Sequence, residues 1–189
     1  MASSTFKTSD GCNIFYTVHE AKGAPKLALI HSLALDGSVW DGVVERLKGK
    51  AELLVPDCRG HGRSGRPHMA YSSELFARDI KEVLDSIGWN KTAAAGCSMG
   101  GCVAQALGGL YPERMTGLAL IDTTAWYGPD APKQFRERAA AAKAKGMQGL
   151  IDFQISRWFS TGFPAANPAR VEETTKVFLA NDFDCYEST

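Results

Sequence analysis

The sequence predicts an α/β fold in which a mostly parallel sheet carries helices on both faces. Short apolar runs at residues 26–30, 52–56 and 115–121, and a run of small residues at 92–95, are typical of strands buried on both faces. Between them, apolar residues recur at helical spacing, most clearly over residues 72–88. Buried strands that alternate with amphipathic helices indicate a parallel sheet.

The remaining segments place further elements around this sheet. Residues 5–20 predict an N-terminal hairpin, because Asp10-Gly11 is a turn signal between two strand-like segments. Helices are expected at 39–47 and 99–111, and residues 57–67 read as a glycine-rich loop. Ser72 or Ser73 can cap the start of helix 72–88, and Gly88 can close its end.

The pattern changes after residue 131. Helices are expected at 133–145, 149–159 and 168–180, with no strand between them. We therefore expect a core at residues 1–131 and a helical cap segment at residues 132–189.

Composition excludes several classes of protein. The 189 residues are 44% hydrophobic, and 21 basic residues balance 21 acidic ones, which argues against disorder and against binding of nucleic acid. No apolar run approaches the ~18 residues that a membrane helix needs. Residues 1–7 lack a signal-peptide core. Five cysteines without a CxxC pair argue against a disulfide framework or a zinc site, so no metal site is expected and a cytoplasmic location is the default.

Residues 96–100 carry the strongest chemical signal. Gly96-Cys97-Ser98-Met99-Gly100 fits the pattern G-x-S-x-G, follows an expected strand and opens an expected helix. A strained turn there lifts the Ser98 hydroxyl above the sheet, at a helix N-terminus that favours developing negative charge. We interpret Ser98 as a nucleophile; the alternative is a Gly/Ser turn that packs a helix tightly on the sheet. Cys97 is interpreted as a small packing residue.

Two other clusters follow strand ends. Residues 31–33 come after the first buried strand, where a backbone N–H for an oxyanion hole is needed; Leu33 is the candidate, with Met99 as the second donor. The alternative is an ordinary loop. His31 is expected to bond loop backbone rather than act as a base. Residues 57–65 are interpreted as a structural loop in which Asp57 and Arg59 can pair.

Together these clusters resemble the α/β-hydrolase fold family, and the resemblance covers essentially the whole chain. Four stretches look similar to the 3-oxoadipate enol-lactonase group: Ser32-Leu33 with Trp40 downstream, and residues 122–128, 157–159 and 179–182. The resemblance implies a serine hydrolase that cleaves a carboxylic ester or a lactone. Dehalogenation needs a carboxylate at the position of Ser98, whereas perhydrolysis and C–C hydrolysis stay open.

Family members complete the triad late in the chain, in the order serine, acid, histidine. All four histidines here precede Ser98. The resemblance therefore implies that the last strands and helices, the acid and the base are missing, and that the chain is inactive or nearly so. Asp122 is a possible acid, because some members carry it at the end of this strand; the alternative is a turn cap. Trp126 and Trp158 line a substrate pocket or form the cap's own core.

Two function classes follow. The leading one is an ester or lactone hydrolase with a small-molecule substrate and no cofactor. The other is a non-catalytic interaction protein built on an incomplete scaffold, in which strand 115–121 forms an exposed apolar edge that pairs with a partner or a second copy.

Overall fold

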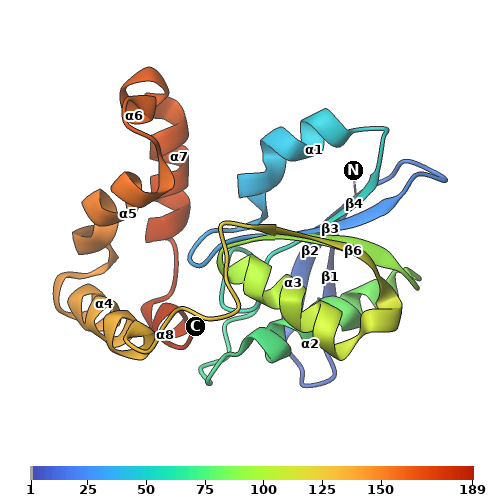
Figure 1. Ribbon diagram of the computed structural model, residues 1–189, viewed down its shortest axis with the longest axis horizontal. Coiled ribbons are helices and arrows are strands. Elements are labelled where there is room, and N and C mark those ends of the chain that lie inside the picture. The colour runs from blue at the N-terminus through green and yellow to red at the C-terminus, as the bar shows by residue number, and fades with distance from the viewer. Residues whose placement is uncertain (1) are drawn as a thin grey trace.

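The computed structural model of the protein describes residues 2–189, and a six-stranded mixed sheet organises its core (Figure 1). The strand order is β1-β2-β4-β3-β5-β6. β1 pairs antiparallel with β2 and β2 antiparallel with β4, whereas β4, β3, β5 and β6 run parallel. The strands are β1 (Ala2–Lys7), β2 (Asn13–His19), β3 (Lys26–Ile30), β4 (Glu52–Pro56), β5 (Thr92–Cys97) and β6 (Met115–Ile121). The N-terminal hairpin and the mostly parallel sheet are thus confirmed.

Alternate side chains of the central strands pack on opposite faces of the sheet, which explains the continuous apolar runs. On one face, Leu29 and Leu53 pack with Trp40 beneath the 3-10 helix η1 (Gly37–Trp40) and helix α1 (Asp41–Leu47). On the other, Ile30 and Leu54 pack with α2 (Ser73–Ser86) and α3 (Met99–Leu110). Figure 1 shows α1 on one side of the sheet and α2 and α3 on the other. The expected helices on both faces are confirmed.

Helix α2 begins where the sequence predicts. The Ser72 side chain accepts a hydrogen bond from the Leu75 N–H at 3.1 Å, which satisfies one free donor of the first turn. The chain then leaves the helix through Gly88, whose φ of +71° favours glycine.

The segment after β6 is helical and lies beside the sheet (Figure 1). It comprises α4 (Ala131–Lys145), the 3-10 helix η3 (Met147–Leu150), α5 (Ile151–Trp158), α6 (Phe163–Ala166), α7 (Pro168–Leu179) and α8 (Phe183–Glu187). The sequence pattern did not predict α6 or α8, which are only one turn long. The segment after β6 has its own apolar cluster around Phe178, and Leu33 and Ala34 of the β3–η1 loop join that cluster. This loop therefore lies where the sheet and the cap segment meet.

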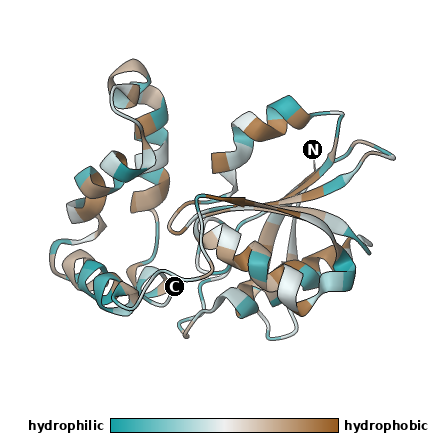
Figure 2. Ribbon diagram, in the orientation of Figure 1, coloured by the Kyte–Doolittle hydropathy of each residue, from teal (hydrophilic) through white to brown (hydrophobic). Residues whose placement is uncertain are grey.

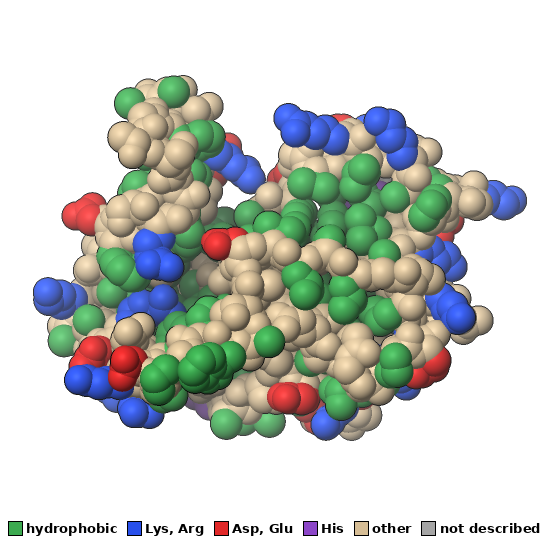
Figure 3. Space-filling model, in the orientation of Figure 1, with side chains coloured by type: hydrophobic (Ala, Val, Ile, Leu, Met, Phe, Trp, Pro, Cys, Tyr) green, Lys and Arg blue, Asp and Glu red, His purple; other side chains and the backbone are tan. Residues whose placement is uncertain are grey.

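β6 is an edge strand with little cover. Residues 116–121 are all exposed, and Leu118, Leu120 and Ile121 keep 42–47% of their side-chain surface open. Figure 2 shows this strand as strongly hydrophobic, and Figure 3 shows hydrophobic side chains gathered on the same face of the molecule. Among residues 2–189, no helix combines the length and the apolar composition needed to cross a membrane.

Candidate functional site

Ser98 stands on a strained turn between β5 and α3. Its φ of +52° and ψ of −116° put a residue with a side chain in a backbone region that normally requires glycine. Its N–H donates to the Ile121 carbonyl at 2.9 Å, and its own carbonyl accepts the Thr123 hydroxyl at 2.8 Å. The end of β6 therefore holds both sides of the turn in place. The strained strand–turn–helix expected at the G-x-S-x-G motif is therefore present, and the role of Ser98 as a nucleophile stays a prediction.

Three glycines make this turn possible. A Cβ on Gly96 would overlap the backbone of Gly100, and a Cβ on Gly100 would overlap the carbonyls of Ile30 and His31. A Cβ on Gly101 would overlap the Thr123 side chain. Helix α3 can therefore approach β3 and β5 closely only because these positions carry no side chain.

The two predicted oxyanion donors lie at adjoining strand ends. Met99 is the first residue of α3, and Leu33 follows β3, which is the neighbour of β5 in the sheet. Among residues 2–189, neither the Leu33 N–H nor the Met99 N–H donates a backbone hydrogen bond. The Ser32 hydroxyl donates to the Cys97 carbonyl at 3.2 Å and so ties the Leu33 loop to the Ser98 turn. These N–H groups are available for a ligand oxygen, and their role stays a prediction.

The loop that carries Leu33 is fixed by the cap segment. Ala34 is fully buried with a φ of +57°, an uncommon conformation for alanine. Its carbonyl accepts a hydrogen bond from the Asn181 side-chain amide at 2.8 Å, and that amide also reaches the carbonyls of Val177 and Phe178. Sequence reasoning placed residues 179–182 in the cap but gave Asn181 no role, because the contact spans 147 positions.

His31 and His61 are structural. The His31 Nε2 accepts the Cys58 N–H at 2.9 Å, so its Nδ1 carries the proton and donates to the Ser32 carbonyl at 2.8 Å. His61 Nδ1 lies 2.9 Å from the Arg59 carbonyl. Burial lowers the pKa of both imidazoles, that of His61 to about 3, so both are neutral at pH 7. Among residues 2–189, no histidine is hydrogen-bonded to Ser98.

The expected Asp57–Arg59 pair does not form. Asp57 instead accepts the N–H groups of Gly37 and Arg63 at 2.9 Å each. The Arg59 guanidinium forms two 2.6 Å hydrogen bonds with Asp79 of α2 and lies 2.9 Å from Asp10. The prediction was wrong because it considered only local partners, whereas the fold brings α2 and the hairpin turn to the guanidinium. The loop itself is structural, as expected.

Asp122 and Tyr127 follow β6 near the Ser98 turn. Asp122 has a φ of +46° and an exposed side chain, and within the described chain that side chain neither caps a turn nor contacts a histidine. The Tyr127 hydroxyl lies 3.7 Å from the Cys102 thiol. Burial raises the pKa of Tyr127, while the Thr123 and Ser98 side chains oppose the shift. The phenol therefore lies against the first turn of α3, which Ser98 precedes, and the sequence gave no signal for this beyond its aromatic character.

The two tryptophans occupy different environments. Trp158 packs edge-on against Phe178, with ring centroids 5.4 Å apart, in the apolar cluster of the cap segment. Trp126 is 72% exposed on the segment between β6 and α4. Their predicted contact with substrate stays a prediction.

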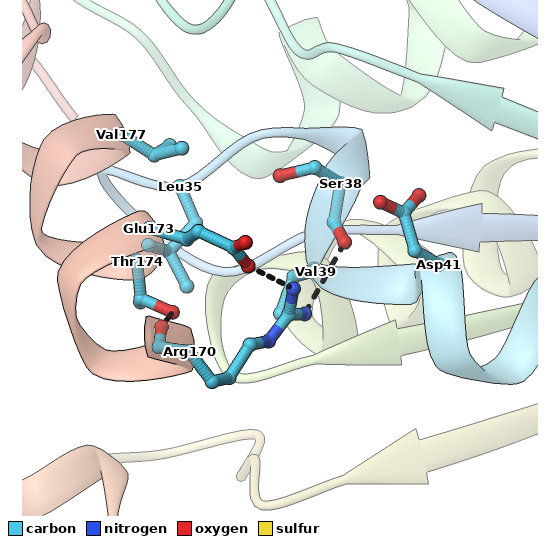
Figure 4. A pocket seen from close by; sticks show the side chains of 8 residues that line it. All are labelled: Leu35, Ser38, Val39, Asp41, Arg170, Glu173, Thr174 and Val177. Atoms are coloured by element: carbon cyan, nitrogen blue, oxygen red, sulfur yellow. Dashed lines mark hydrogen bonds and ion pairs between the residues drawn. The ribbon is translucent and has the colours of Figure 1, made fainter. Parts of the chain in front are cut away.

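A cavity of about 250 Å³ lies between the cap segment and the sheet side of the molecule (Figure 4). Leu35, two residues after the oxyanion candidate Leu33, lines it together with Val39 and Val177. Arg170 crosses it from α7, with one guanidinium nitrogen 3.4 Å from Glu173 and another 3.4 Å from the Ser38 carbonyl. Neither Ser98 nor its neighbours in the turn line this cavity, so it is distinct from the candidate nucleophile.

Known proteins identify the family of the chain. Residues 25–164 match the family model of the alpha/beta hydrolase fold. The chain is 25% identical over 181 residues to 3-oxoadipate enol-lactonase 2 of Acinetobacter baylyi, covering 96% of this chain and 67% of that protein. It therefore spans about two thirds of that relative's length.

Solved structures give the same result. A hydrolase from Pseudomonas aeruginosa superposes with a TM-score of 0.91 at 30% identity, covering 98% of this chain and 70% of that one. The enol-lactonase from Burkholderia xenovorans superposes with a TM-score of 0.91 at 28% identity, covering 98% and 71%.

Proposed function

The chain belongs to the α/β-hydrolase fold family, and from this premise we propose that it provides the nucleophile and the oxyanion hole of an enzyme that cleaves a carboxylic ester or a lactone. The observation that carries the proposal is the strained Ser98 turn, with unpaired N–H groups at Leu33 and Met99. The named enol-lactonase relatives support the substrate class.

The proposed reaction begins when Ser98 Oγ attacks the carbonyl carbon of the ester. The C=O electron pair moves to the oxygen, where the Leu33 and Met99 N–H groups stabilise the negative charge. The positive end of the α3 dipole acts in the same direction. Collapse of the tetrahedral intermediate expels the alkoxide, which stays attached to the acyl group when the substrate is a lactone. Water then releases the acyl group from Ser98.

Activation of Ser98 requires a base for its proton. His31 and His61 are buried, neutral and engaged with backbone, and His68 lies at the contact with α8. His19 pairs with Leu53 near the start of β4, whereas Ser98 follows the opposite, C-terminal end of the parallel strand β5. We therefore place the base outside the four histidines of this sequence. Asp122 is retained as a candidate acid because it follows β6 and is exposed.

The first test is intact-mass spectrometry of the natural gene product before and after a fluorophosphonate probe, which acylates activated serines. The proposal predicts one adduct per protein, mapped to Ser98. In the isolated 189-residue chain the adduct should form far more slowly, since loss of a triad member leaves only ~10³–10⁴-fold acceleration.

Two matched variants sharpen the test. Ser98→Ala should abolish the adduct, whereas Ser86→Ala, at an exposed serine at the end of α2, should leave it unchanged. An adduct that survives in Ser98→Ala, or none in the natural product, would reject Ser98 as the nucleophile.

A second candidate function is non-catalytic interaction, and the exposed apolar strand β6 is the observation that favours it. In this case the natural product has a mass near 20.4 kDa, takes no adduct and self-associates through β6. For either function a reducing, cytoplasmic location is proposed, because all five cysteines are free thiols.

A further inference from the structure

The loop after residue 65 meets α8 at the junction of the sheet and the cap segment. The Tyr71 N–H donates to the Ser188 carbonyl at 3.0 Å, and the Arg66 guanidinium donates to the Ala180 carbonyl at 3.3 Å. These contacts join residues more than a hundred positions apart. The same junction carries a group of side chains that the proposed hydrolysis does not use.

His68, Asp182 and Cys185 converge at this junction. One imidazole nitrogen, one carboxylate oxygen and the thiol sulfur all lie within 4.8 Å of one another. The His68 Nε2 is 3.8 Å from the nearer Asp182 oxygen. Ligand atoms of a tetrahedral zinc ion, with bonds of about 2.0–2.3 Å, lie roughly 3.3–3.8 Å apart. A closure of about 1 Å would bring the three atoms to that spacing.

The types of ligand select the metal. Imidazole nitrogen, thiolate sulfur and carboxylate oxygen together are ligands that Zn²⁺ accepts, whereas Ca²⁺ and Mg²⁺ prefer oxygen alone. The spacing of Asp182 and Cys185 is fixed by α8, because the Asp182 carboxylate caps the helix by accepting the Cys185 N–H at 3.0 Å. Two ligands are thus positioned in advance.

The second nitrogen of His68 supports the same interpretation. His68 Nδ1, the ring nitrogen that does not face Asp182, lies 3.6 Å from a carboxylate oxygen of Asp184. A histidine that binds zinc through one nitrogen commonly donates its other N–H to a carboxylate, which orients the ring. Asp184 can fill that role.

The exposure of the ligands also suits a bound cation. His68 is 62% exposed and can move toward the ion, while Cys185 is 1% exposed and supplies a fixed sulfur. Asp182 and Asp184 bring two carboxylates to the two sides of the same imidazole.

We propose that His68, Asp182 and Cys185 bind one Zn²⁺ ion, with Asp184 orienting the imidazole and a water molecule as the fourth ligand. Binding forms the Zn–S bond as the Cys185 thiol releases its proton to solvent. The ion fastens α8 to the loop after residue 65 and so holds the cap segment against the sheet.

The test uses the 189-residue chain after treatment with a chelator. Titration with Zn²⁺ against a chromophoric competitor should give one ion per chain, and Zn²⁺ should raise the thermal midpoint. Titration with Co²⁺ should give a sulfur-to-metal charge-transfer band and the visible bands of tetrahedral cobalt. Cys185→Ser should remove the charge-transfer band, and His68→Gln should weaken zinc binding at least tenfold.

Matched variants separate this site from adventitious binding. His19→Gln and Cys102→Ser, which alter the same residue types elsewhere, should leave zinc affinity unchanged. Asp184→Asn should weaken it about 10-fold, as loss of an orienting partner does. Because Cys185 is buried and its substitution can disturb folding, the exposed His68 provides the decisive variant.

The proposal is overturned if zinc binds His68→Gln as tightly as the unchanged chain, or if Co²⁺ gives no band that depends on Cys185. Zinc binding is independent of Ser98, so its failure leaves the proposed hydrolysis untouched, and a missing serine adduct says nothing against the metal.

Discussion

β1 and β6 are the two edge strands of one sheet, yet their sequences differ in kind. β1 consists mainly of serine, threonine and lysine around Phe6, and such side chains suit an edge that faces water. β6 reads Met-Thr-Gly-Leu-Ala-Leu-Ile and has no polar residue after Thr116. The apolar strand is nevertheless exposed along most of its length. β6 thus has the composition of an interior strand at an edge position.

The packing around β2 and β4 is also tighter than the packing around the edge strand β6. Beside β2 and β4, most of the 57–65 loop is buried, and Asp57, Arg59 and His61 tie it to its neighbours. Around β6, the apolar side chains are 42–47% exposed. The β2–β4–β3 region should therefore carry most of the stability, whereas β6 should affect association.

The largest expected effect is at the buried ion pair between Arg59 and Asp79, beside the β2–β4–β3 region. Arg59→Met leaves the Asp79 carboxylate, 4% exposed, without its partner, so the free energy of unfolding should fall by about 3–5 kcal/mol. Urea denaturation at pH 7 measures this. The double variant Arg59→Met/Asp79→Leu should recover most of the loss, because no charge then stays buried. A double variant as unstable as the single one would show that packing of the guanidinium matters more than its charge.

A matched pair of leucines compares the two regions directly. Leu54 of β4 is fully buried and Leu120 of β6 is 47% exposed. Leu54→Ala should cost about 2–5 kcal/mol through lost burial and the cavity that remains. Leu120→Ala should cost less than about 1 kcal/mol, because half of its surface already meets water. Equal losses in urea denaturation would mean that β6 is covered in solution.

Acid should destabilise the fold through the buried histidines beside the β2–β4–β3 region, rather than through β6. The pKa of His61 is lowered by burial to about 3, below the ~6.5 of an unfolded chain, so below pH 6.5 only the unfolded state takes up this proton. Stability should therefore fall by about 1.4 kcal/mol per pH unit as the pH drops from about 6 to 4.5, and the lowered pKa of His31 adds to this. Asp10 and Asp85, whose pKa values are also lowered, act below this window.

Urea midpoints measured between pH 7 and 4.5 test this slope. His61→Gln should reduce it by about one proton, because one imidazole no longer distinguishes the folded from the unfolded chain. An unchanged slope would assign the acid sensitivity to other groups.

Sequence patterns predicted the sheet better than the contacts. The runs at 26–30, 52–56 and 115–121 became strands with those bounds, because residues buried on both faces leave a continuous apolar signal. The one-turn helices α6 and α8 were missed, since so few residues show no period. The partner of Arg59 was missed because Asp79 lies twenty positions away on α2.

The candidate site also has one part that the sequence could predict and another that it could not. The Ser98 turn was predictable, because its glycines are local in the sequence and sterically required. The Asn181 contact with Ala34 and the 3.7 Å approach of the Tyr127 hydroxyl to the Cys102 thiol join residues far apart in the sequence, for which no local pattern exists. The His68–Asp182–Cys185 cluster, for which we propose a zinc ion, joins residues at least 114 positions apart, so the CxxC spacing on which the expectation of no metal site rested could not detect it.

The smallest effect on stability, and the sharpest test of the comparison, is expected from charges placed on β6. If two copies pair through antiparallel β6 strands centred on Leu118, Arg114 of one copy lies opposite Asp122 of the other. Leu118→Lys/Leu120→Lys should then convert the associated chain to monomers in sedimentation velocity, with a change of less than about 1 kcal/mol in unfolding free energy. Thr5→Lys on β1 is the matched control and should change neither quantity, because that edge is already polar. A monomeric unchanged chain would show that apolar composition alone does not make β6 an interface. Association that persists in the lysine variant would place the contact elsewhere.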